Sequence, residues 1–221
     1  MPRPGKGGRY HHGDLRAALI DTAIELIGER GVRGFSLAEA SRRLGVAVSA
    51  PYAHFTDRDD LLAAVAVHGY ELCYAELVSG TGQISEPADR LAAMARRYIR
   101  FAAEHRPLFE MLYESGLDKA RHPEIEAAEL PLTDAFLGCV RALSGGEGPG
   151  SGEAFAEDLA TAVEATAYGH ARLLLDDGDG QGAEAVEQAA ERAARATLAL
   201  IESRRLLGRP APPGACQADA R

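Results

Sequence analysis

The sequence has no uninterrupted run of about 18 apolar residues, which excludes an ordinary membrane-spanning helix. Its opening segment, MPRPGKGGRYHHGD, also lacks the apolar core of a secretory signal peptide. The 221 residues are 46% hydrophobic and 26% charged, which is enough apolar material for one large domain or two small ones. We therefore expect a soluble globular protein of the cytoplasm.

Cysteines and strand-forming patterns are scarce as well. Cys73, Cys139 and Cys216 are odd in number and far apart, which fits neither a disulfide framework nor a zinc site of the CxxC type. We interpret them as free thiols. Alternation of polar and apolar residues never persists, whereas Ala, Leu, Glu and Arg dominate. The sequence therefore predicts an all-α fold.

Signatures of catalysis are absent from the sequence. No Gly-rich phosphate loop follows a strand pattern, and neither HExxH nor GxSxG occurs. His11 and His12 are adjacent in a predicted loop, whereas metal sites draw their ligands from separated turns. We predict no enzyme, no catalytic or metal-binding residue and no cofactor. Other histidines and glutamates could converge in the folded chain, although solvent-facing histidines are commoner: His68, His105 and His170, with Glu104 or Glu164.

The net charge of −9 is unevenly distributed. Residues 1–55 carry eight Lys and Arg against five Asp and Glu, whereas residues 56–221 carry sixteen against twenty-eight. This asymmetry indicates one end that faces an anion and an acidic body, although an ordinary solvated surface can also differ by this much.

A flexible arm and a helix are predicted at the N-terminus. Residues 1–12 are rich in Gly, Pro and basic side chains and lack apolar residues to bury. Apolar residues then recur at helical spacing over about 14–30, until Gly31 ends the helix.

Two shorter helical segments follow this first helix. Ser36 and Glu39 have the spacing of a capping box, which starts a helix over 37–44. A helical turn or two is predicted over 47–55. A supporting helix followed by two short ones is the layout of a helix-turn-helix, so we expect a three-helix DNA-binding domain at residues 13–57.

The remaining sequence predicts a six-helix domain at residues 58–207 for ligand binding and dimerisation, with a disordered tail at 208–221. Pro131 falls inside the fourth of these helices and is a candidate for splitting or kinking it. By apolar spacing the six helices cover about 58–79, 86–104, 107–114, 123–143, 153–177 and 183–206.

The last two helices carry stripes of small residues, which permit close helix packing. Such stripes suit a four-helix interface between two copies of the chain, and packing within one chain is the alternative. The candidate interface residues are Leu159, Val163, Thr166, Leu174, Val186, Ala190, Ala193, Thr197 and Leu200.

Aromatic and long apolar residues come from five or six of the predicted body helices. Pockets in helical proteins form between helices and are mainly apolar with a few polar groups. Some of these residues are therefore expected to line a cavity for a small ligand, although filling the core is the commoner role for any single one. The candidates are Tyr70, Tyr74, Met94, Tyr98, Phe101, His105, Phe109, Leu112, Tyr113, Phe136, Tyr168 and His170.

Residues 10–68 resemble the head of TetR family transcription regulators. The most specific run is Tyr52, His54, Phe55, Arg58 and Leu61, which matches the family's Y-x-H-F-x-x-K-x-x-L signature with Arg in place of Lys. The body resembles family members only in helix count and length, so the identity of the ligand does not carry over.

The resemblance implies that Ala47–His54 is the recognition helix, with Val48, Ser49 and Ala50 directed toward base edges. These short side chains can contact thymine methyl groups and form one hydrogen bond through Ser49, but they cannot form the bidentate pairs of Arg with guanine or Asn with adenine. Phe55 is expected in the core. The remaining DNA-contact candidates are expected on phosphates or, for the arm, in the minor groove: Ser36, Arg43, Tyr52, His54, Arg58, Lys6 and Arg9.

The sequence thus predicts a ligand-responsive transcription regulator that binds a palindromic operator as a homodimer, as a repressor released by a small, mostly apolar effector. A helical ligand-binding or scaffold protein that does not bind DNA is the alternative, which only the acidic body favours.

Overall fold

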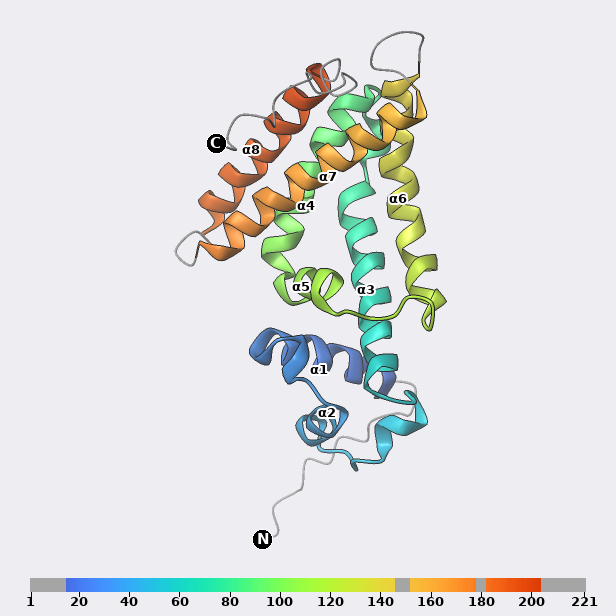
Figure 1. The fold of residues 1–221 in the computed structure, drawn as a ribbon. Helices are drawn as coiled ribbons and strands as arrows, with labels where there is room; N and C mark the ends of the chain where they lie inside the picture. The colour runs from blue at the N-terminus through green and yellow to red at the C-terminus, as the bar shows by residue number, and fades with distance from the viewer. Residues whose placement is uncertain (1–14, 146–151, 178–181, 204–221) are drawn as a thin grey trace, which may run out of the picture. The chain divides into compact units, whose positions relative to one another are not determined.

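The computed structural model describes residues 15–145, 152–177 and 182–203, and these residues form α- and 3-10 helices and no strand. The predicted all-α fold is confirmed. In chain order the elements are α1 (Leu15–Arg30), η1 (Val32–Gly34), α2 (Leu37–Leu44), η2 (Ala50–Ala53), α3 (Arg58–Val78), η3 (Thr81–Gln83), α4 (Pro87–Glu104), α5 (Arg106–Glu114), α6 (Pro123–Ser144), α7 (Glu153–Asp176) and α8 (Ala183–Glu202) (Figure 1).

Contacts divide the chain into two compact units. The first unit comprises residues 1–72 and 105–130, and the second comprises residues 73–104 and 131–221. The long helices α3 and α6 each contribute residues to both units. The expected domains at 13–57 and 58–207 were defined by their expected roles, whereas these two units are defined by contacts between residues. The two divisions need not coincide.

The ends of α2 show why the sequence forms a helix there. The Ser36 side-chain oxygen accepts a hydrogen bond from the Glu39 amide at 3.3 Å. This amide lies in the first turn, where backbone N–H groups lack a carbonyl partner within the helix, so the serine caps the helix. Gly45 follows with φ of 68°, a left-handed conformation that glycine adopts without a Cβ penalty. The helix predicted over 37–44 is therefore confirmed.

The first unit contains the packed core of α1, α2 and the start of α3. Leu19, Leu26 and Ile27 of α1 are buried, as are Leu61 and Leu62 of α3. Helix α1 also packs against α5, and Gly28 lies at this contact: a Cβ built there would lie 2.9 Å from Cγ of Pro107. Glycine at this position lets the two helix backbones approach.

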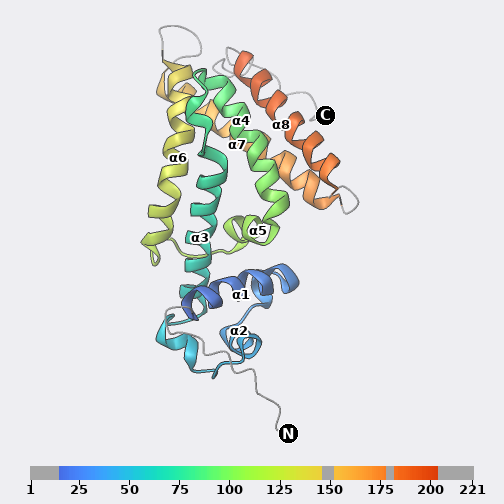
Figure 2. The same ribbon diagram turned by 180° about the vertical axis from the view of Figure 1, so that it is seen from behind.

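In the second unit α4, α7 and α8 pack side by side (Figures 1 and 2). Small residues on α8, among them Ala190 and Ala193, permit this close packing. At the margin of the contact Arg96 of α4 pairs with Glu191 of α8 at 2.6 Å, and Arg100 pairs with Glu187 at 2.8 Å. The sequence stripes of α7 and α8 therefore pack within one chain.

This packing corrects the residue assignment for the dimer interface. Six of the nine candidates are already covered by the chain's own atoms and offer no surface to a second copy: Leu159, Val163, Leu174, Ala190, Ala193 and Thr197. Thr166, Val186 and Leu200 are half-buried.

Helix α6 runs without a break through Pro131, so of the two outcomes considered for this residue the helix is not split. Residues Arg58–Gln83 have the length and apolar composition of a membrane-crossing helix. Half of the most apolar 18-residue window in this range is buried inside the chain, and Leu61 and Leu62 are fully buried, which is typical of a core helix.

Candidate nucleic-acid interface

The helical turn expected in the segment after α2 is a 3-10 helix over Ala50–Ala53. Its backbone bonds join residues three apart, from the Ala50 amide to the Ala47 carbonyl at 2.9 Å and from the Tyr52 amide to the Ser49 carbonyl at 3.2 Å. Pro51 has no amide hydrogen, so it cannot donate to the Ala47 carbonyl as an α-helix would require. The hydrogen bonds therefore give this segment 3-10 winding over Ala50–Ala53.

This segment carries both buried side chains, which anchor it, and exposed ones. Pro51 is buried and Phe55 is 2% exposed, as the expected core position of Phe55 requires. Val48 is 53% exposed and Tyr52 is 59% exposed, which makes them two of the six exposed large hydrophobic residues of the described chain. A short, anchored segment that presents a valine, a tyrosine and the exposed Ser49 is suited to contact another molecule.

Arg58 holds the segments on either side of this turn together. Its Nε donates to the Phe35 carbonyl at 3.2 Å, and its Nη2 donates to the Val32 carbonyl. The guanidinium also lies 5.8 Å from the centroid of the Phe35 ring and contacts Asp59. These contacts give Arg58 a positioning function within the head, and its expected phosphate contact stays a prediction.

Arg43 is likewise engaged within the chain. Its two terminal nitrogens each donate to a carboxylate oxygen of Glu29 at 2.7 Å, and Glu25 lies 3.8 Å away. The hydrogen bond from Arg43 lowers the pKa of Glu29, and the same bond raises the pKa of Arg43. Arg43 therefore ties α2 to α1, and Ser36 caps α2 from an exposed position.

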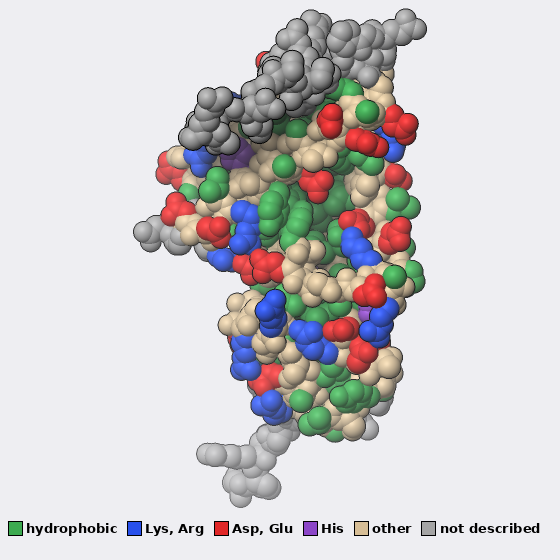
Figure 3. All heavy atoms as spheres, in the orientation of Figure 1, with side chains coloured by type: hydrophobic (Ala, Val, Ile, Leu, Met, Phe, Trp, Pro, Cys, Tyr) green, Lys and Arg blue, Asp and Glu red, His purple; other side chains and the backbone are tan. Residues whose placement is uncertain are grey.

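Arg33 is a candidate that the sequence reasoning missed. It is exposed in η1 and forms no hydrogen bond or ion pair with the described part of the chain. The sequence does not show that Arg43 is paired and Arg33 is not, because the pairing of Arg43 with Glu29 arises only on folding. On the surface in Figure 3 basic and acidic side chains lie interspersed over the head, with hydrophobic side chains at its lower end. His54 is half-buried, and Lys6 and Arg9 lie outside the described residues.

Two family models match the chain. Residues 19–65 match the model for bacterial regulatory proteins of the tetR family. Residues 91–202, half of the chain, match the model for the tetracyclin repressor-like C-terminal domain. The chain belongs to the TetR family. The predicted family is thus confirmed, and the protein is a helix-turn-helix transcription regulator.

A curated protein and two solved structures resemble the chain over more than half of its length. The uncharacterized HTH-type transcriptional regulator Rv2912c of Mycobacterium tuberculosis is 30% identical over 136 residues, which cover 59% of this chain and 68% of that protein. A protein of unknown function from Rhodococcus sp. RHA1 has a TM-score of 0.66 at 29% identity, covering 86% of this chain and 97% of that one. AibR, solved with isovaleryl coenzyme A and operator DNA, has a TM-score of 0.63 at 21% identity, covering 81% and 95%, and at this identity the likeness concerns the fold.

The twelve residues predicted to line a ligand cavity of this TetR regulator fall into both units. In the first unit Phe109 is buried against Tyr113, with ring centroids 5.2 Å apart, and Leu112 approaches Gly69. Seven lie in the second unit: Tyr74, Met94, Tyr98, Phe101, Phe136, Tyr168 and His170. There, burial and then the charge of Arg192 lower the pKa of His170, which favours a neutral imidazole.

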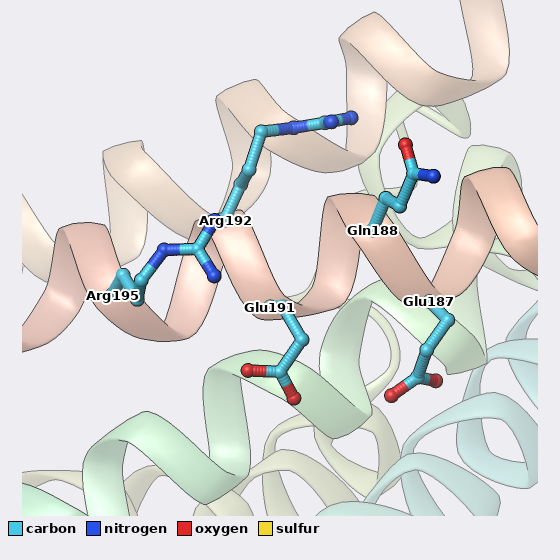
Figure 4. A pocket seen from close by; sticks show the side chains of 5 residues that line it. All are labelled: Glu187, Gln188, Glu191, Arg192 and Arg195. Atoms are coloured by element: carbon cyan, nitrogen blue, oxygen red, sulfur yellow. The ribbon is translucent and has the colours of Figure 1, made fainter.

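Two hollows of about 390 Å³ lie in the second unit, and neither is lined by any of those twelve residues. In the first, on α8, Glu187 and Glu191 point toward α4 whereas Gln188 and Arg192 point the opposite way (Figure 4). The second lies between the end of α6 and the start of α7, beside Leu137, Val140 and Ala156.

Proposed function

We propose that the protein is a transcriptional repressor that binds a palindromic operator as a homodimer and leaves it when a small, mostly apolar effector binds. The observation that carries the proposal is the exposed row of Val48, Ser49 and Tyr52 on a segment anchored by Pro51 and Phe55. The TetR membership supports a role in regulation and not in catalysis, and it supports a site of action in the cytoplasm, where the operator lies.

Binding affinity and base preference should reside in different side chains. Val48 and Ser49 can contact thymine methyl groups and one hydrogen-bonding group, whereas the Tyr52 hydroxyl is proposed to contact a phosphate. Since few base-specific hydrogen bonds are available, phosphate contacts should dominate affinity and make it fall steeply with salt concentration.

A gel shift with the DNA upstream of the chain's own gene tests this proposal. Tyr52→Phe should weaken binding to all sequences about equally, and Ser49→Ala should change base preference. Arg33→Ala should lower the slope of log affinity against log salt by about one unit. Absence of binding to this and to a randomised DNA library would favour the alternative, a helical ligand-binding or scaffold protein.

The effector is proposed to bind in the helical body and to act on the head through α3, which starts directly after the DNA-binding segment. Two recognition segments must lie about 34 Å apart to read one turn of DNA, so a small movement of α3 spoils simultaneous docking. A switch from 1:99 to 99:1 requires about 5.5 kcal/mol of differential affinity. Burial of apolar surface at roughly 25 cal/mol per Å² in one state can supply it. AibR, which shares the fold, was solved with both isovaleryl coenzyme A and operator DNA, and this supports the proposal that a protein of this fold binds a small molecule as well as DNA.

The dimer is proposed to form through the outward faces of α7 and α8. Leu173 of α7 supports this surface because it is 71% exposed, the most exposed of the large hydrophobic residues described. Leu173→Arg should convert the dimer to a monomer in light scattering, whereas Ala142→Arg, at an exposed position on α6, should not. Ala193→Arg is unsuitable for this test, because Ala193 is fully buried and its replacement would unfold the chain. An unchanged dimer in Leu173→Arg would exclude this surface.

A further inference from the structure

Three side chains of metal-ligating type converge in the first unit. Asp60 belongs to the first turn of α3, His122 directly precedes α6, and Glu124 lies in the first turn of α6. One ligand atom from each lies within 4.8 Å of the others. His122 is only 8% exposed, Asp60 is half-buried and Glu124 is exposed.

Backbone hydrogen bonds fix the positions of these residues. The His122 amide donates to the Lys119 carbonyl at 3.1 Å, and the His122 carbonyl accepts from the Ile125 amide at 3.0 Å. On α3 the Asp60 amide donates to Asp57 at 2.9 Å, and Asp60 Oδ2 accepts from the Thr56 amide at 2.8 Å. The backbone that carries the three side chains is thus held by hydrogen bonds at the starts of α3 and α6.

We propose that Asp60, His122 and Glu124 bind a divalent transition-metal ion of the Zn²⁺ or Co²⁺ class. Two donor atoms that each lie about 2.1 Å from a tetrahedral ion are about 3.4 Å apart. His122 Nδ1 and Glu124 Oε1 are 3.2 Å apart, so one pair already has this spacing. The side chain of the exposed Glu124 can rotate so that its carboxylate and Asp60 contact the same ion. Water would complete the coordination.

The charges of the site select the class of ion. Two carboxylates supply two negative charges, which must outweigh the partial positive charges of the two helix N-termini. The imidazole nitrogen favours a transition metal over Mg²⁺ or Ca²⁺, which prefer oxygen ligands. The neighbouring cations face other groups, since Lys119 pairs with Glu129 and Arg121 lies 3.9 Å from Asp57.

Metal binding would join the first turn of α3 to the first turn of α6, which are separated by more than 60 residues in sequence. This inference does not rest on the proposed repressor function, because it concerns metal affinity alone. The sequence reasoning missed it because His122 and Glu124 match no metal motif until folding adds Asp60.

Titration of the tag-free full chain with Zn²⁺ against a chromophoric chelator, and with Co²⁺ by visible absorption, tests the site. We expect one ion per chain and a Co²⁺ spectrum that shows nitrogen and oxygen ligation. His122→Gln and Glu124→Gln should each weaken binding by about tenfold or more. His68→Gln removes an exposed histidine of α3 outside the cluster and should leave binding unchanged.

The controls separate the site from other metal binders and from misfolding. Circular dichroism verifies that each variant is folded, and Glu124→Gln serves if the buried His122 cannot be replaced. His11→Gln with His12→Gln should leave binding intact. Equal affinities of the wild type and Glu124→Gln, or binding that disappears only with the His11 and His12 replacements, would overturn the proposal and leave His122 and Glu124 as a hydrogen-bonded pair.

Discussion

Arg58 contacts Phe35 in two ways: its Nε donates to the Phe35 carbonyl at 3.2 Å, and its guanidinium lies 5.8 Å from the centroid of the Phe35 ring. The two residues are 23 positions apart and flank the segment that carries Val48 and Tyr52. The interaction therefore closes the loop that presents the proposed DNA-contacting side chains, and it assigns to Arg58 a structural function that its charge alone does not suggest.

Arg58→Ala should destabilise the protein by about 1–3 kcal/mol, because the carbonyls of Val32 and Phe35 lose their charged donor. Urea unfolding monitored by circular dichroism measures the change. Arg33→Ala, which removes an exposed arginine without such contacts, should change stability by less than about 0.5 kcal/mol. Equal stability of both variants would show that Arg58 is not a structural tie.

Gly28→Ala should destabilise the protein by about 1 kcal/mol or more, because the added Cβ would lie 2.9 Å from the rigid ring of Pro107. Gly138→Ala is the matched control: it lies within α6 and has no heavy atom within 4 Å of the added Cβ. It should stabilise by about 0.5–1 kcal/mol through helix propensity. If Gly28→Ala stabilised the protein as much as Gly138→Ala, the contact of α1 with α5 would have to be looser than described.

Cys73 should resist thiol reagents in the folded protein. Burial raises its pKa to about 12, with a further contribution from Glu76, so almost no thiolate exists at about pH 8. Labelling with iodoacetamide followed by peptide mass spectrometry should detect Cys73 only after denaturation. Labelling of the Cys73 peptide at the same rate with and without denaturant would contradict its burial.

The pair of Arg96 and Glu191 should make stability depend on acid pH. The hydrogen bond from Arg96 holds the pKa of Glu191 below its ordinary value of 4.5. A lowered folded-state pKa stabilises the protein above the ordinary pKa, and the contribution is lost as pH falls through the lower folded-state value. The urea midpoint should therefore fall less between about pH 6 and about pH 3 in Glu191→Gln than in the wild type. Parallel curves for the two proteins would indicate that the pair contributes nothing.

The sequence by itself determined the local features of this protein. Helical spacing, the Ser36 cap and Gly45 fixed α2 to the residue, because a cap and a left-handed glycine act over only a few neighbouring positions. The run from Tyr52 to Leu61 was sufficient to predict the TetR family, since the family signature is local as well. The exposed position of Val48 and the buried position of Phe55 followed from the resemblance to the family.

Only the tertiary structure decided which surfaces are free and which charges are paired. The stripe with Ala190 and Ala193 suits packing within a chain and packing between chains equally, and the contact with α4 and α7 settled the matter for those residues. Arg33 and Arg43 are equivalent in sequence, yet Glu29 meets only Arg43. Asp60 and His122 become neighbours in the same way. Each of these outcomes depends on residues distant along the chain, and no local preference specifies which distant partner a side chain meets.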